Sequence, residues 1–204
     1  MKKIKICGLS RPIDIETVNL VKPNYCGFII NFPKSRRNVS PEAVKLLRAK
    51  LNPAITPVGV FVDQPPEIVA GLLNNGTISI AQLHGQEDKR YIAALRRLTD
   101  KPVWQAFQIR FRAEAVRAAK STADFVLLDA GQGAGKAFDW SLLVGFPRPF
   151  GLAGGLNSEN LSDALKTEAS LLDVSGGVET GGVKDPEKIM NFVKIVRSYK
   201  WYLS

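Results

Sequence analysis

The chain has 204 residues, of which 45% are hydrophobic and 23% charged, so it has the composition of a soluble globular protein with one domain or at most two. No apolar run of signal-peptide length follows the N-terminal lysines, and no stretch approaches the roughly 20 apolar residues that span a bilayer, which favours a cytoplasmic protein. The formal charge of +9 is spread along the chain rather than gathered in one tract, which disfavours nucleic-acid binding and indicates either a solvated basic surface or attraction of an anionic substrate.

Short β-branched or aliphatic runs recur along the chain and predict eight strands. They cover residues 4–7, 25–30, 56–62, 78–83, 102–107, 125–129, 150–153 and 171–174. Amphipathic segments between them predict helices over residues 13–21, 43–51, 65–74, 88–98, 113–121, 159–166 and 188–197. Two helices have clear start signals, because Ser40-Pro41-Glu42 and Asp185-Pro186-Glu187 each join a capping side chain to a proline suited to the first turn.

This alternation of strands and helices predicts an α/β fold with a parallel sheet covered by helices. Eight units of roughly 25 residues match a minimal (β/α)8 TIM barrel, whose usual size starts at about 200 residues, so we expect one barrel domain over residues 1–204. A doubly wound open sheet is the alternative. In a barrel, the chemistry lies in the loops after the carboxyl ends of the strands.

Two glycine loops follow the seventh and eighth predicted strands, at the positions where barrels commonly bind phosphate through backbone N–H groups. They contain Gly154-Gly155 and Ser175-Gly176-Gly177. Glycine matters there because it lets an anion approach the main chain. These loops predict a phosphorylated small-molecule substrate, although a glycine pair on its own is more often a plain turn.

Cys7 ends the first predicted strand, and its side chain shares a face with that of Lys5 two residues earlier. An ammonium group nearby would favour the thiolate, which makes Cys7 a candidate base near neutral pH. Core packing is the alternative for Cys7 and the only expectation for Cys26. We expect both thiols to be free, and no zinc site, since only His84 could join them as a nitrogen ligand.

Asp129 ends the sixth predicted strand after four apolar residues, which suits a partly desolvated carboxyl acting as an acid. A loop cap is the alternative. The glycine-rich segment that follows, residues 131–136, is a candidate lid, and a plain turn is the alternative. Gln82 and His84 share a face at the end of the fourth predicted strand, where His84 is either catalytic or structural.

Arg36 and Arg37 lie in the loop after the second predicted strand. Their planar guanidinium groups suit a carboxylate, and the alternative is simple solvated charge.

The combination of motifs resembles the phosphoribosylanthranilate isomerase family over essentially the whole chain. The motifs occur in the family's order and spacing at residues 5–8, 32–35 with Arg37, 58–62, 82–85, 127–129, 138–140, 152–156 and 173–175.

The resemblance implies an Amadori rearrangement of N-(5-phosphoribosyl)anthranilate in tryptophan biosynthesis, without metal or organic cofactor. Asp129 would be the general acid, Cys7 the general base, and Arg37 the ligand of the anthranilate carboxylate, with the neighbouring Arg36 as the alternative ligand. The other residues that it implies for substrate binding are His84, Asp173, Gly154, Gly155, Ser175, Gly176 and Gly177.

Four positions depart from the family's usual pattern. They are Gly176 in place of a second serine, Ala134 in place of a hydroxyl residue, Gly182 in place of proline and Asn38 in place of a frequent aromatic. Without a hydroxyl at Gly176, one phosphate hydrogen bond would have to come from backbone N–H groups.

Two alternative functions differ in whether they need Cys7 and Asp129. The histidine-pathway sister isomerase usually has aspartate where this chain has Cys7, and a non-catalytic phosphate or nucleic-acid binder would not need both Cys7 and Asp129. The sequence leaves the oligomeric state open between monomer and homodimer.

Overall fold

The computed structural model describes residues 1–129 and 140–199. Eight parallel strands form a closed barrel, because the first strand, β1 (Lys3–Cys7), pairs with both the second and the last. The others, in order around the barrel, are β2 (Tyr25–Ile30), β4 (Thr56–Phe61), β5 (Ile80–Leu83), β6 (Val103–Gln108), β7 (Phe125–Asp129), β8 (Phe150–Ala153) and β9 (Leu171–Val174). This confirms the predicted barrel and excludes the open sheet.

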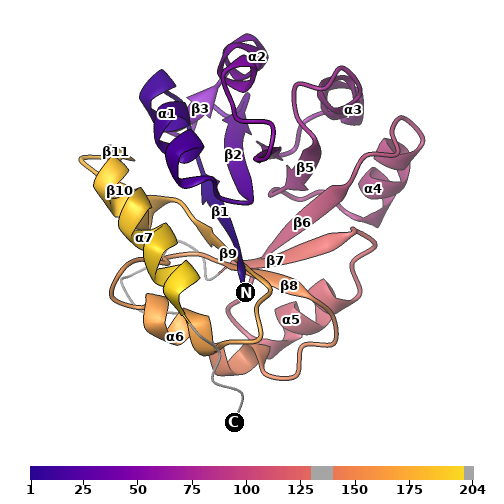
Figure 1. Cartoon of the computed structure of the whole chain (residues 1–204). Coiled ribbons are helices and arrows are strands. Elements are labelled where there is room, and N and C mark those ends of the chain that lie inside the picture. Colours follow the sequence, from indigo (N-terminus) through magenta and orange to yellow (C-terminus); the bar gives the residue numbers. More distant parts are fainter. Residues whose placement is uncertain (130–139, 200–204) are drawn as a thin grey trace.

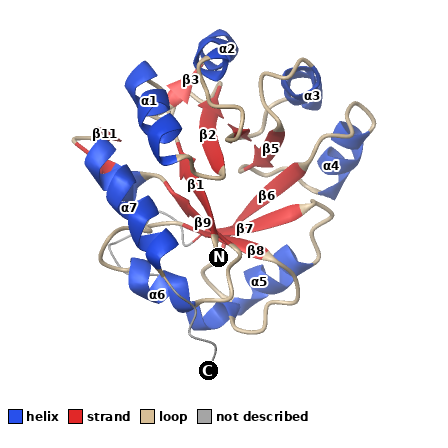
Figure 2. Cartoon of the chain, in the orientation of Figure 1, coloured by secondary structure: helices blue, strands red, loops and turns tan. Residues whose placement is uncertain are grey.

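The helices lie outside the ring of strands (Figures 1 and 2). They are α1 (Pro12–Val21), α2 (Pro41–Ala49), α3 (Pro66–Asn74), α4 (Lys89–Arg96), α5 (Arg112–Ala119), α6 (Leu161–Lys166) and α7 (Pro186–Ser198). Between β7 and β8 the described residues form only a short 3-10 helix, η1 (Trp140–Leu143), where the sequence also predicts no α-helix. None of the helices in the described ranges has the length and hydropathy that a bilayer crossing requires.

The predicted start signals work as expected. Ser40 accepts a hydrogen bond from the backbone N–H of Ala43 over 3.2 Å, and proline begins α2. Asp185 accepts from the N–H groups of Glu187 and Lys188 over 3.0 and 3.2 Å, and proline again follows the cap. These side chains satisfy N–H groups that have no partner inside the helix.

Several short elements go beyond the sequence prediction. β3 (Asn38–Val39) pairs in parallel with the carboxyl end of β2, and η2 (Gly176–Val178) leads into an antiparallel hairpin of β10 (Glu179–Thr180) and β11 (Val183–Lys184). The two-residue hairpin turn has positive φ at Gly181 and Gly182, 58° and 83°, as such turns require. Strands of two residues are too short for a hydrophobic alternation to predict them.

The hydrophobic core has two parts. A large shell packs the helices against the outside of the barrel. A smaller cluster fills the barrel interior with one residue from each of six strands, namely Val58, Ile80, Trp104, Leu127, Ala153 and Leu171. The barrel is therefore a packed core rather than a pore.

Candidate active site

The inward-facing side chains become polar toward the carboxyl ends of the strands. Gln82, Asp129 and Asp173 each follow an apolar interior residue by two positions on the same strand, so they share its inward face. Cys7 is the last residue of β1, between β2 and β9. The polar residues thus gather at the end of the barrel where enzymes of this fold place their chemistry.

Cys7 and Lys5 share the inward face of β1, as predicted. A Cβ added to Gly27 on β2 would lie 2.7 Å from Cys7 Sγ and 3.1 Å from Lys5 Nζ, so this glycine leaves room for both side chains. Lys5 is fully buried and donates a hydrogen bond from Nζ to Oδ2 of Asp173 over 2.8 Å. The thiol therefore lies beside a buried ion pair rather than beside a lone positive charge.

The pKa of the Cys7 thiol is raised above its ordinary value. Burial is the main cause; the ammonium groups of Lys5 and Lys184 act against it, while the Asp173 carboxylate adds to the increase. The direction of this pKa shift is opposite to the one that Lys5 alone would give, because Asp173 offsets the charge of Lys5 and burial outweighs the attraction that is left. Burial also raises the pKa of Cys26 to about 12, and both thiols are free, as expected.

Asp129, the predicted acid, ends β7 with its side chain 16% exposed. Its Oδ2 lies 3.5 Å from Nε2 of His84, and the amide nitrogen of Gln82 lies 3.4 Å from Nδ1 of the same ring. An amide N–H directed at Nδ1 favours the histidine tautomer with its proton on Nε2, which faces Asp129. The structure thus places the predicted histidine between an amide and the candidate acid.

Arg37 lies beside Cys7 and makes a two-point contact with Glu179. Its Nε and Nη2 donate to the two carboxylate oxygens over 2.6 and 2.7 Å. Arg36 donates to Oε2 over 2.6 Å, and Lys184 contacts Oε1. Burial opposes ionisation of Glu179, but hydrogen bonds from Arg37 and Lys184 outweigh it and lower the pKa of this carboxyl to about 2.

The two glycine loops predicted to bind phosphate contact each other. Gly154 and Gly155 follow β8 with φ angles of 84° and 67°, which favour glycine. A Cβ added to Gly177 would lie 1.8 Å from the carbonyl oxygen of Leu156, so only glycine lets the loops approach this closely. Ser175 is near the cysteine end of β1, since its Oγ would lie 3.2 Å from a Cβ added to Gly8.

The sequence reasoning missed Glu179 and Lys184 as site residues. Both are buried, and they pair across the hairpin that follows η2. The signal available in the sequence was the Gly181-Gly182 pair between residues suited to strands, which is typical of a two-residue hairpin turn. The predicted lid, residues 131–136, lies outside the described residues.

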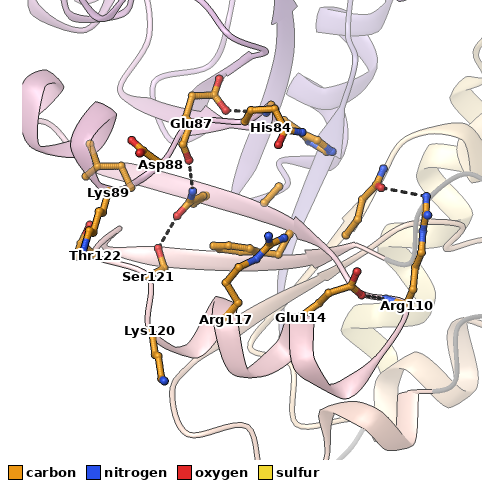
Figure 3. A pocket seen from close by; sticks show the side chains of 17 residues that line it. His84, Glu87, Asp88, Lys89, Arg110, Glu114, Arg117, Lys120, Ser121 and Thr122 are labelled. Carbon is orange, nitrogen blue, oxygen red and sulfur yellow. Dashed lines mark hydrogen bonds between the residues drawn. The ribbon is translucent and has the colours of Figure 1, made fainter.

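A cavity of about 500 Å³ lies between α4 and α5 and extends to the carboxyl ends of β5 and β6 (Figure 3). Gln105 crosses it, donating to the carbonyl of Glu87 over 2.6 Å and accepting from the hydroxyl of Ser121 over 2.6 Å. Of the predicted site residues, only His84 reaches it. The cavity therefore adjoins the polar mouth at His84. The described ranges contain no group of three or more acidic, histidine or cysteine side chains placed to hold a metal ion.

Comparison with known proteins agrees with this geometry. Residues 4–195 match the family model described as N-(5'-phosphoribosyl)anthranilate (PRA) isomerase. The chain is 42% identical to N-(5'-phosphoribosyl)anthranilate isomerase of Endomicrobium trichonymphae, over 97% of this chain and 100% of the relative.

Solved structures of such isomerases are similar along their whole length. A monomeric form of the dimeric enzyme of Thermotoga maritima has a TM-score of 0.84 and 30% identity, covering 98% of this chain and 100% of that one. An isomerase in complex with reduced 1-(o-carboxyphenylamino)-1-deoxyribulose 5-phosphate has a TM-score of 0.86 and 30% identity, with the same coverage. A closed barrel, a polar mouth and full-length similarity agree, and the chain belongs to the N-(5'-phosphoribosyl)anthranilate isomerase family.

Proposed function

We propose that this protein isomerises N-(5'-phosphoribosyl)anthranilate to 1-(2-carboxyphenylamino)-1-deoxyribulose 5-phosphate in tryptophan biosynthesis. The observation that carries the proposal is the full-length family match of a chain that has Cys7 and Asp129 at the ends of β1 and β7. A related isomerase binds a reduced form of this product, which supports the same substrate class. The histidine-pathway alternative is not favoured, because its strand-one aspartate is replaced here by Cys7.

We assign the proton transfers to these two side chains. Asp129 donates a proton to the furanose ring oxygen, the C1–O bond breaks, and the nitrogen lone pair forms an iminium. The Cys7 thiolate then removes the C2 proton, the C–H electrons neutralise the iminium, and the resulting enolamine tautomerises to the ketone. The positive charge of the iminium near Cys7 favours the thiolate, so it offsets part of the increase in pKa that burial causes in the free enzyme.

The remaining predicted site residues hold the substrate in this proposal. Arg37 binds the anthranilate carboxylate. Arg36 contributes indirectly, because it and Arg37 both donate hydrogen bonds to the carboxylate of Glu179. His84 and Asp173 face the sugar from opposite sides of the mouth. The backbone N–H groups of the glycine loops bind the phosphate, together with the hydroxyl of Ser175.

We also propose a cytoplasmic protein that acts as a monomer or homodimer. Biosynthetic function supports the location, and the dimeric enzyme of Thermotoga maritima supports the second oligomeric form. Size-exclusion chromatography with light scattering separates the two oligomeric states.

The function is tested by following loss of substrate fluorescence in a coupled assay. Anthranilate and phosphoribosyl pyrophosphate, with a separate transferase, supply the substrate in situ. We expect rapid loss with the wild-type protein and a loss of rate on the order of 10²- to 10⁴-fold in Cys7→Ala and in Asp129→Ala.

Each variant has a matched control. Cys26→Ala removes the other buried thiol, and Asp124→Asn removes a carboxylate charge just before β7, at the opposite end of the barrel from Asp129. Both controls should retain activity. No turnover by the wild-type protein contradicts the function, whereas full activity in Cys7→Ala contradicts only the assigned base.

A further inference from the structure

Glu179 is the centre of a charged cluster next to the end of β1, where Arg37 covers Gly8. Its carboxylate accepts hydrogen bonds from Arg36 and Arg37 and contacts the ammonium of Lys184, and its side chain is 4% exposed. No other carboxylate in the described part of the chain binds two guanidinium groups.

Two parts of the chain distant in sequence meet in this cluster. The arginines lie in the loop after β2, whereas Glu179 begins the β10–β11 hairpin, more than 140 residues later. Lys184 is the cross-strand neighbour of Glu179 and also donates to the carbonyl oxygen of Ser175 over 3.2 Å. The hairpin therefore connects the arginine loop after β2 with the loop after β9, which is predicted to bind phosphate.

The contacts of Arg37 define which of its edges remains available. Nε and Nη2 both donate to Glu179, which leaves Nη1 outside this pairing. The side chain also covers Gly8, because a Cβ there would lie 2.4 Å from Arg37 Cδ. Arg37 is thus held next to the end of β1, immediately beside the candidate base.

Charge in the cluster is unbalanced. Arg36, Arg37 and Lys184 supply three positive charges, and Glu179 supplies one negative charge. The surplus lies on the arginine side, since the side chain of Arg36 is 61% exposed while those of Lys184 and Glu179 are nearly inaccessible. The carboxylate of a ligand would therefore pair with the positive charge of the arginines that Glu179 does not balance.

We propose that Glu179 is a positioning residue that selects substrates with a carboxylate on the aromatic amine, by holding Arg36 and Arg37 together as one carboxylate clamp. The inference rests on the proposed function and deepens it. Glu179 does not touch the substrate; it fixes the guanidinium planes before binding, so the ligand does not have to order two flexible side chains. Glutamine in its place would keep the shape but remove the charge that opposes repulsion between the two arginines.

Equilibrium binding separates this role from a merely structural one. The probes are reduced 1-(o-carboxyphenylamino)-1-deoxyribulose 5-phosphate and its phenylamino counterpart without the carboxylate, titrated calorimetrically into the wild-type protein and Glu179→Gln. We expect the variant to bind the carboxylated probe on the order of 10- to 100-fold more weakly, as for loss of hydrogen bonds to charged groups. Binding of the probe without carboxylate should change less than about twofold.

Asp124→Asn serves as the control, because it removes an arginine-paired carboxylate at the opposite end of the barrel. Parallel weakening of both probes in a folded Glu179→Gln protein, or no change in either, overturns the selective role. If Glu179→Gln has no cooperative thermal transition, Arg36→Gln tests the clamp instead and should weaken only the carboxylated probe. Equal binding of both probes by the wild-type protein would contradict the proposed substrate, whereas a wild-type preference that survives in Glu179→Gln contradicts only this inference.

Discussion

At the scale of single residues, Lys5 and Asp173 form a buried ion pair within the site. Lys5 is fully buried, and within the described residues no donor reaches Oδ1 of Asp173. Lys5→Met leaves the buried carboxylate of Asp173 without a positively charged partner. We therefore expect urea unfolding to show that the free energy of unfolding falls by about 3–5 kcal/mol. The double variant Lys5→Met/Asp173→Leu should recover most of this loss, because two apolar side chains leave no charge to solvate. Equal stability of the single and double variants would contradict this account.

The thiol of Cys7 provides a second prediction at this scale. Because burial raises its pKa, alkylation by iodoacetamide should be slow at neutral pH and should accelerate as the pH rises above the ordinary thiol range. Lys5→Met removes an ammonium that favours the thiolate, so the same acceleration should need a higher pH. Mass spectrometry of labelled peptides follows the reaction, and Cys26, fully buried, should stay unlabelled. Fast labelling at neutral pH would contradict the raised pKa.

At the scale of elements, the β10–β11 hairpin is the device that brings Glu179 to the arginine loop. Gly182 has φ of 83° in its turn, so Gly182→Ala should cost about 1–2 kcal/mol and weaken binding of the carboxylated probe. Gly71→Ala is the matched control, because Gly71 lies inside α3 with open space around its Cβ position. That change should stabilise the protein by up to about 1 kcal/mol. Thermal unfolding should therefore move in opposite directions for the two variants.

At the scale of the whole molecule, the charged cluster at the barrel mouth links stability to pH. The pKa of Glu179 is lowered from an ordinary 4.5 to about 2, so its stabilising contribution is complete above about pH 4.5 and is lost as the pH falls through about 2. Urea midpoints of wild-type and Glu179→Gln proteins should therefore differ at pH 6 and converge as the pH approaches 2. A difference that grows with acidification would contradict this linkage.

The sequence alone determined the alternation of eight strands with helices, the positions of Cys7 and Asp129 at strand ends, and helix starts such as Ser40, because each depends on local periodicity and capping. Only the tertiary structure decided that Lys5 pairs with Asp173, 168 residues away, and that Glu179 holds Arg37, 142 residues away. It also decided that burial and Asp173 act against Lys5 on the pKa of Cys7, because a pKa depends on burial and on every charge nearby. Side-chain alternation gives the face of a strand, but barrel closure and strand register decide which faces meet.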